Sequence, residues 1–119
     1  KESSAHESFK KLVLKAKEGD TQLTLKELTP VRMLNNKFFQ EILQLYKENA
    51  SKEILLKKLG KGRAKSGMFE GDLINGELEI GQASSQIIEV NSAAQIIRQV
   101  MEEFNEVKKQ ISIENKFSF

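Results

Sequence analysis

Eight apolar residues in the last third of the sequence recur at the spacing of one helix face. The stripe is Ala93, Ile96, Ile97, Val100, Met101, Phe104, Val107 and Ile111. Repeats at three and four residues predict a long amphipathic helix. Ser92 and Gln95 have the spacing of a capping box, which indicates where this helix begins. A stripe of this length needs an apolar surface along most of one face.

Shorter elements are predicted before this helix. Residues 21–25 alternate over too few positions for more than a short extended stretch. Together with the long helix, the elements make a mainly α segment of four to five helices with little strand. The other expected helices run from the capping pair Ser4 and Glu7 to Gly19, from about Asn36 to Glu48, from the cap Ser51 to Leu59, and from Gly81 to Val90.

Composition removes several classes of function. The 119 residues suffice for one modest domain, and they include no cysteine and a single histidine, His6. Disulfides, thiolate zinc sites and histidine metal clusters are therefore excluded. No apolar run approaches the roughly 20 residues that span a bilayer. We therefore expect no membrane partner. The basic run over residues 57–65 lacks interleaved aromatic side chains, so we expect no nucleic-acid partner either.

Six of the seven glycines lie in residues 60–81, which predicts a long loop with a helical turn over residues 63–69. Gly62 and Gly67 have the glycine spacing of a phosphate-binding loop, but Met68 stands where that motif requires lysine. The acidic residues in and after this loop do not follow a calcium-loop pattern, and we expect them to be solvated turn residues rather than metal ligands. They are Glu70, Asp72, Glu77 and Glu79.

Four segments in order carry a resemblance to a known family. They are Lys1–His6 (KESSAH), Leu28–Lys37 (LTPVRMLNNK), Gly67–Asp72 (GMFEGD) and Gly76–Gln82 (GELEIGQ). The sequence, from residue 1 to about 110, resembles the C-terminal part of the FMN-dependent nitronate monooxygenases, once called 2-nitropropane dioxygenases. It is similar too to their relatives, the FMN-dependent enoyl-ACP reductases.

The resemblance implies a fold and a cofactor. The family fold is a (β/α)8 TIM barrel that holds FMN, and residues 1–112 would be its C-terminal helical portion, followed by a frayed tail at 113–119. Most FMN contacts and the family's catalytic histidine would lie upstream. His6 does not match the family's His-x-Gly motif, so we expect no catalytic residue in this segment. Its partner would be the remainder of the barrel, and homo-oligomer formation stays open.

The resemblance also implies a site and an activity. Gly81 and Gln82 match a loop that approaches the flavin or substrate, and Glu79 departs from the family pattern beside it. Lys61, Arg63 and Lys65 would draw anionic substrates toward this loop.

The intact parent is predicted to be a cytosolic oxidoreductase that oxidises alkyl nitronates with O2, and the segment alone is expected to be inactive. Two alternatives are an enoyl-ACP reductase and a free-standing helical interaction module.

Overall fold

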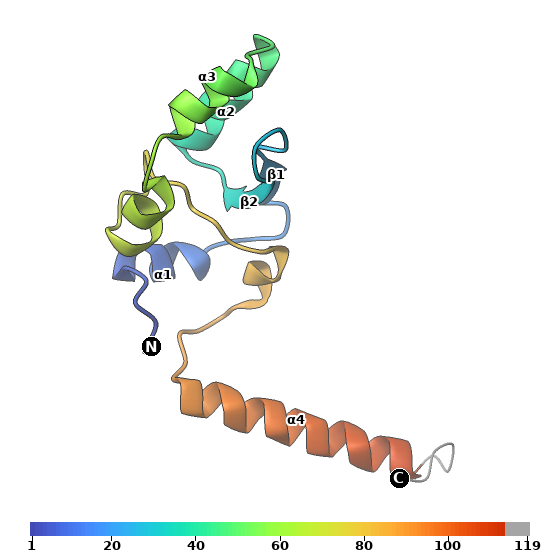
Figure 1. The fold of residues 1–119 in the computed structure, drawn as a ribbon. Coiled ribbons are helices and arrows are strands. Elements are labelled where there is room, and N and C mark those ends of the chain that lie inside the picture. Colours follow the sequence, from blue (N-terminus) through green and yellow to red (C-terminus); the bar gives the residue numbers. More distant parts are fainter. Residues whose placement is uncertain (114–119) are drawn as a thin grey trace. The chain divides into compact units, whose positions relative to one another are not determined.

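The computed structural model describes residues 1–113 and divides the chain into two units. One unit is Ser4–Glu89, and the other consists of Lys1–Ser3 and the chain from Val90 onward. As predicted, the chain is mainly helical with little strand (Figure 1). In chain order the first unit contains α1 (Glu7–Val13), β1 (Thr21–Thr24), β2 (Val31–Leu34), α2 (Lys37–Lys47), α3 (Lys52–Leu59), a π-helical turn (Lys65–Phe69) and a 3₁₀ turn (Gln82–Gln86).

A small antiparallel sheet stands at the centre of the first unit. β1 pairs with β2 in a register that places Thr21 opposite Leu34. The segment Leu78–Ile80 then runs along the other edge of β2. The N–H of Leu34 donates to the Leu78 carbonyl over 3.0 Å, and the N–H of Ile80 donates to the Arg32 carbonyl over 3.1 Å. β2 is therefore held from both sides, and the chain leading to Gln82 is fixed to it.

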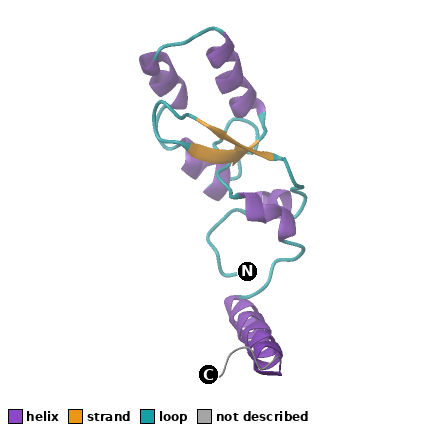
Figure 2. Ribbon diagram, turned by 90° about the vertical axis from the view of Figure 1, so that its right-hand side faces the viewer, coloured by secondary structure: helices purple, strands orange, loops and turns teal. Residues whose placement is uncertain are grey.

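The sheet separates two apolar clusters, because neighbouring residues of a strand face opposite sides. Met33 belongs to the cluster that contains residues of α2 and α3, and Leu34 belongs to the cluster that contains Phe9 of α1. Both side chains are buried. Helices lie on both sides of the two strands in Figure 2. The first cluster comprises Leu25, Met33, Phe38, Phe39, Ile42 and Leu55. The second comprises Phe9, Ala16, Leu34 and Leu78.

The helices after the sheet agree with their sequence signals. α2 begins after Asn36, whose Oδ1 accepts the N–H of Phe39 over 3.0 Å. α3 follows Ser51 and ends at Leu59 as predicted, and the π-helical turn falls within the predicted turn at 63–69.

Two predicted helices are shorter in the structure. α1 is capped by His6 instead of Ser4 and Glu7, and it ends at Val13 instead of Gly19. Tight turns continue the chain beyond Val13 because the N–H groups of Lys15 and Ala16 bond three residues back. The predicted helix from Gly81 to Val90 is a 3₁₀ turn over Gln82–Gln86 only. Packing on the sheet takes precedence over local periodicity at both places.

The second unit contains α4 (Ala93–Ile113). Its predicted capping box is confirmed: the N–H of Gln95 donates to Ser92 Oγ over 3.3 Å, and Gln95 Oε1 accepts the N–H of Ser92 over 2.9 Å. The Glu2 carboxylate accepts the N–H of Ala93 over 3.0 Å, and this backbone donor lowers the pKa of Glu2. Ile113 ends α4, and the rest of the predicted frayed tail lies outside the described residues.

Candidate functional site

The glycine-rich segment folds through a close backbone contact between two of its glycines. A Cβ on Gly76 would lie 2.2 Å from the Cα of Gly67, and a Cβ on Gly67 would lie 2.8 Å from the carbonyl oxygen of Glu77. Both distances are shorter than any side chain tolerates. Glycine is therefore required at both positions, because the two backbone segments touch and leave no room for a side chain between them.

Arg63 ties this segment to the first apolar cluster. Its guanidinium donates to the carbonyls of Leu59 (2.8 Å), Lys58 (3.0 Å) and Asn75 (2.7 Å). The same group lies 4.4 Å from the ring centroid of Phe38, which is a cation–π contact. The predicted role of Arg63 in substrate steering is untested, but its charge is engaged in holding the fold together.

Asn36 holds the segment from the α2 side. Its Nδ2 donates to the carbonyls of Leu73 and Gly76 over 3.0 and 2.8 Å, while its Oδ1 caps α2. One side chain therefore satisfies three backbone groups. The loop is consequently fixed relative to α2 before the chain enters the segment beside β2.

One of the four clustered acids is not a solvated turn residue. The side chain of Glu77 is buried. Burial is the larger cause that raises the pKa of Glu77, and the nearby charge of Glu79 raises it further, whereas the charge of Arg63 lowers it. Glu79 is half-buried beside Met33. The expectation of solvated acids is therefore wrong for Glu77, because the loop turns this residue inward. Asp72 is a turn residue, and the N–H groups of Asn75 and Ile74 lower its pKa.

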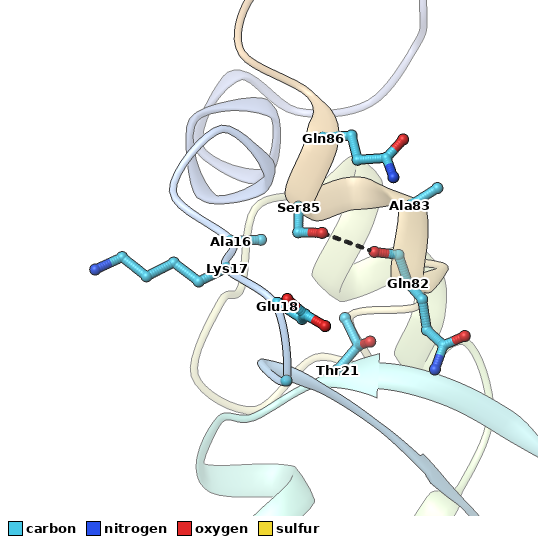
Figure 3. A pocket seen from close by; sticks show the side chains of 9 residues that line it. Ala16, Lys17, Glu18, Thr21, Gln82, Ala83, Ser85 and Gln86 are labelled. Atoms are coloured by element: carbon cyan, nitrogen blue, oxygen red, sulfur yellow. Dashed lines mark hydrogen bonds between the residues drawn. The ribbon is translucent and has the colours of Figure 1, made fainter.

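An open cavity of about 780 Å³ lies beside the predicted site loop. Its walls come from the turn after α1 and from the 3₁₀ turn (Figure 3). Ser85 Oγ donates to the carbonyl of Gln82 over 3.2 Å and closes the 3₁₀ turn. The lining residues are Ala16, Lys17, Glu18, Gly19, Thr21, Gln82, Ala83, Ser85 and Gln86.

The structure brings only part of the predicted site to this cavity. Gln82 lines it, and Gly81 directly precedes the lining turn, but Glu79 lies back along β2. Lys61 and Lys65 are exposed and outside the lining, and Lys65 pairs with Glu70 at 3.2 Å. These site assignments stay predictions.

Sequence reasoning missed the wall formed by residues 16–21. The one local signal is Gly19, which ends the predicted first helix and adopts a positive φ of 89° in the structure. Within the 3₁₀ turn, Ser84 is buried and its hydroxyl has no hydrogen-bond partner among the described residues. Four of the nine lining residues carry an amide or a hydroxyl side chain, and Lys17 and Glu18 are the charged members.

His6 has a structural position. Its Nδ1 accepts the N–H of Ser8 over 3.2 Å, and its ring packs where a Cβ on Gly71 would stand, 2.5 Å from Nδ1. The expectation that His6 is not the family's catalytic histidine stays a prediction. Within residues 1–113, no cluster of three metal-binding side chains forms and no helix is long and apolar enough to cross a membrane.

Comparison with known proteins finds similarity among solved structures. No protein-family model and no curated protein sequence matches the chain. The structure of FabK from Thermotoga maritima matches 91% of this chain and 34% of its own, with 28% identity and a TM-score of 0.77. A point mutant of the same FabK matches 92% of this chain and 32% of its own, with 28% identity and a TM-score of 0.71.

The chain therefore spans about a third of the length of the FabK structures that it matches. FabK is an FMN-dependent enoyl-ACP reductase of the TIM-barrel class, one of the two groups that the sequence resembles. The likeness to a segment of FabK is thereby confirmed at the level of fold. The two FabK structures do not distinguish this group from the nitronate monooxygenases that the sequence also resembles.

Proposed function

We propose that the chain is the C-terminal part of an FMN-dependent oxidoreductase that reduces enoyl thioesters. The observation that carries this proposal is the match to FabK over 91% of the chain at 28% identity. The ordered sequence segments quoted above support the same family independently of the fold. The alternative of a free-standing helical module explains neither observation.

The cavity beside Gln82 suits a neutral polar part of a ligand. Its amide and hydroxyl side chains donate and accept hydrogen bonds, as the carbonyl and N–H groups of a flavin ring or a thioester carbonyl require. Its two charged lining residues, Lys17 and Glu18, are of opposite sign, which does not suit a phosphate. In Figure 3, Lys17 points away from the other labelled side chains. These residues fit the ring or substrate side of FMN better than its phosphate.

FMN, when bound, supplies the hydride chemistry, and the chain described here supplies positioning. The backbone bonds of Leu78–Ile80 to β2 fix the approach to Gln82, and the Ser85 bond fixes the turn that carries it. A side-chain amide held this way orients a carbonyl acceptor without changing charge. The proposed role of Gln82 is therefore to position substrate or flavin, with proton and hydride donors located elsewhere in the enzyme.

The activity test uses the full polypeptide that contains this chain. Consumption of reduced nicotinamide with a crotonyl thioester is expected, together with bound FMN. Oxygen uptake with an alkyl nitronate and no thioester reduction would instead establish the nitronate monooxygenase predicted from the sequence. Purified full polypeptide that binds no FMN would contradict both activities.

The role of Gln82 is tested by replacement in the same enzyme. Gln82→Ala should raise KM or lower kcat by about tenfold, because one hydrogen bond of about 1.4 kcal/mol is lost, while FMN stays bound. Gln44→Ala on α2, outside the cavity lining, is the matched control and should leave both constants unchanged. Loss of FMN from Gln82→Ala would place this residue at the cofactor instead, and unchanged kinetics would remove it from the site.

A further inference from the structure

Thr21 carries a second polar side chain in the wall of the cavity beside Gln82. Thr21 begins β1 and lines the cavity from there, whereas Gln82 lines it from the 3₁₀ turn (Figure 3). Only 7% of the surface of Thr21 is exposed. A hydroxyl in such a position needs hydrogen-bond partners, because burial removes it from bulk water.

Arg32 on the neighbouring strand β2 orients the Thr21 hydroxyl. Its Nη1 donates to the carbonyl of Thr21 over 2.7 Å and, in a longer contact of 3.4 Å, to Thr21 Oγ1. Because the hydroxyl oxygen accepts an N–H there, its own proton points away from Arg32 toward another acceptor. Among the described residues no acceptor for this proton lies within hydrogen-bond distance. The hydroxyl is therefore left with a proton to donate, and a ligand in the cavity can accept it.

Arg32 also connects the two walls that such a ligand would touch. Its side chain holds the backbone of Thr21 through the bond of 2.7 Å. Its carbonyl accepts the N–H of Ile80 over 3.1 Å, and Ile80 stands two residues before Gln82. One residue of β2 therefore fixes both the wall that carries Thr21 and the approach to the turn that carries Gln82.

We propose that the Thr21 hydroxyl donates a hydrogen bond to an acceptor oxygen of the ligand in this cavity, and that Arg32 is the positioning residue that directs the hydroxyl toward it. This inference rests on the proposed function for the nature of the ligand. The thioester substrate and the flavin ring both carry a carbonyl oxygen, and an uncharged hydroxyl donor suits such an acceptor. Thr21 and Gln82 then hold the ligand from two separate elements of the chain.

Replacement of Thr21 in the full polypeptide tests the donor. Thr21→Val keeps the branched shape and removes the hydroxyl. It should raise either the KM for a crotonyl thioester or the dissociation constant of FMN, measured by flavin fluorescence, by about tenfold, because one hydrogen bond is lost. Thr21→Ser keeps the hydroxyl and should restore most of this loss. Thr24→Val is the matched control, because it removes another buried hydroxyl of β1 outside the cavity lining and should leave both constants unchanged.

Replacement of Arg32 tests the positioning. Arg32→Met keeps a long side chain without donors and should raise the same constant by about as much as Thr21→Val does. In the double variant the two effects should not multiply, because both act on one hydroxyl. Arg32→Lys keeps one charged donor and should fall between the parent and Arg32→Met.

The outcomes separate this proposal from the proposed function. A raised KM identifies the substrate oxygen as the acceptor, and a raised FMN dissociation constant identifies the flavin ring. Unchanged constants in Thr21→Val, or an equal change in Thr24→Val, would overturn the donor and leave the reductase function standing. Effects that multiply in the double variant would overturn the role of Arg32. Turnover of an alkyl nitronate without thioester reduction would refute the reductase, whereas a raised KM for that nitronate in Thr21→Val would still support the donor. A full polypeptide that binds no FMN and turns over neither substrate would overturn both proposals.

Discussion

Replacement of Arg63 tests whether this side chain holds the glycine-rich segment in place. Arg63→Ala removes three hydrogen bonds from a charged donor and the contact with the Phe38 ring. Bonds from charged groups contribute about 1.5–3 kcal/mol each and the ring contact about 0.5–1 kcal/mol, but these contributions are not additive. Since Arg63 is partly exposed, we expect a loss of about 3 kcal/mol in the free energy of unfolding of the chain.

Urea denaturation measures this loss as a fall of about 1–2 M in the transition midpoint. Arg63→Lys keeps the charge but loses the planar group that reaches three carbonyls. The urea midpoint of Arg63→Lys should therefore lie between those of the parent chain and Arg63→Ala. Arg98→Ala on α4 is the matched control and should change stability by less than about 0.5 kcal/mol. An Arg63→Ala variant as stable as the parent, or an Arg63→Lys variant without effect, would show that the three bonds do not hold the segment.

Three further predictions concern the same region. Folding raises the pKa of Glu77, so above pH 4.5 the folded chain binds more protons than the unfolded chain. The free energy of unfolding should therefore fall as the pH rises through the raised pKa. Urea titrations at several pH values should show a smaller fall for Glu77→Gln than for the parent chain. Gly76→Ala should cost about 2 kcal/mol or more, whereas Gly81→Ala, which meets nothing within 4 Å, should be tolerated in the same thermal assay. Replacing Lys61 and Lys65 together by Gln should lower kcat/KM for an anionic substrate at low salt and leave it unchanged at high salt, and an equal effect at both salt concentrations would exclude steering.

Local signals in the sequence predicted the elements whose stabilising contacts are close in the chain. The Asn36 cap and the apolar spacing that follows it predicted α2, and the Ser92–Gln95 box predicted the start of α4. Caps and helical periodicity involve residues three or four positions apart, so they are visible without a tertiary structure. The ordered segments from Leu28–Lys37 to Gly76–Gln82 likewise led to the nitronate monooxygenases and their enoyl-ACP reductase relatives before any fold was known, and the match to FabK supports the second group.

Long-range contacts decided the remaining features. Arg63 reads as a surface cation in the sequence, yet its partner Asn75 is twelve residues later and Phe38, whose ring it contacts, is twenty-five residues earlier. Glu77 reads as a turn acid, but the contact between two glycines carries it into the interior. The cavity beside Gln82 needs the turn after α1, more than sixty residues earlier. Such pairings depend on which surfaces the sheet brings together, and no local spacing records that choice.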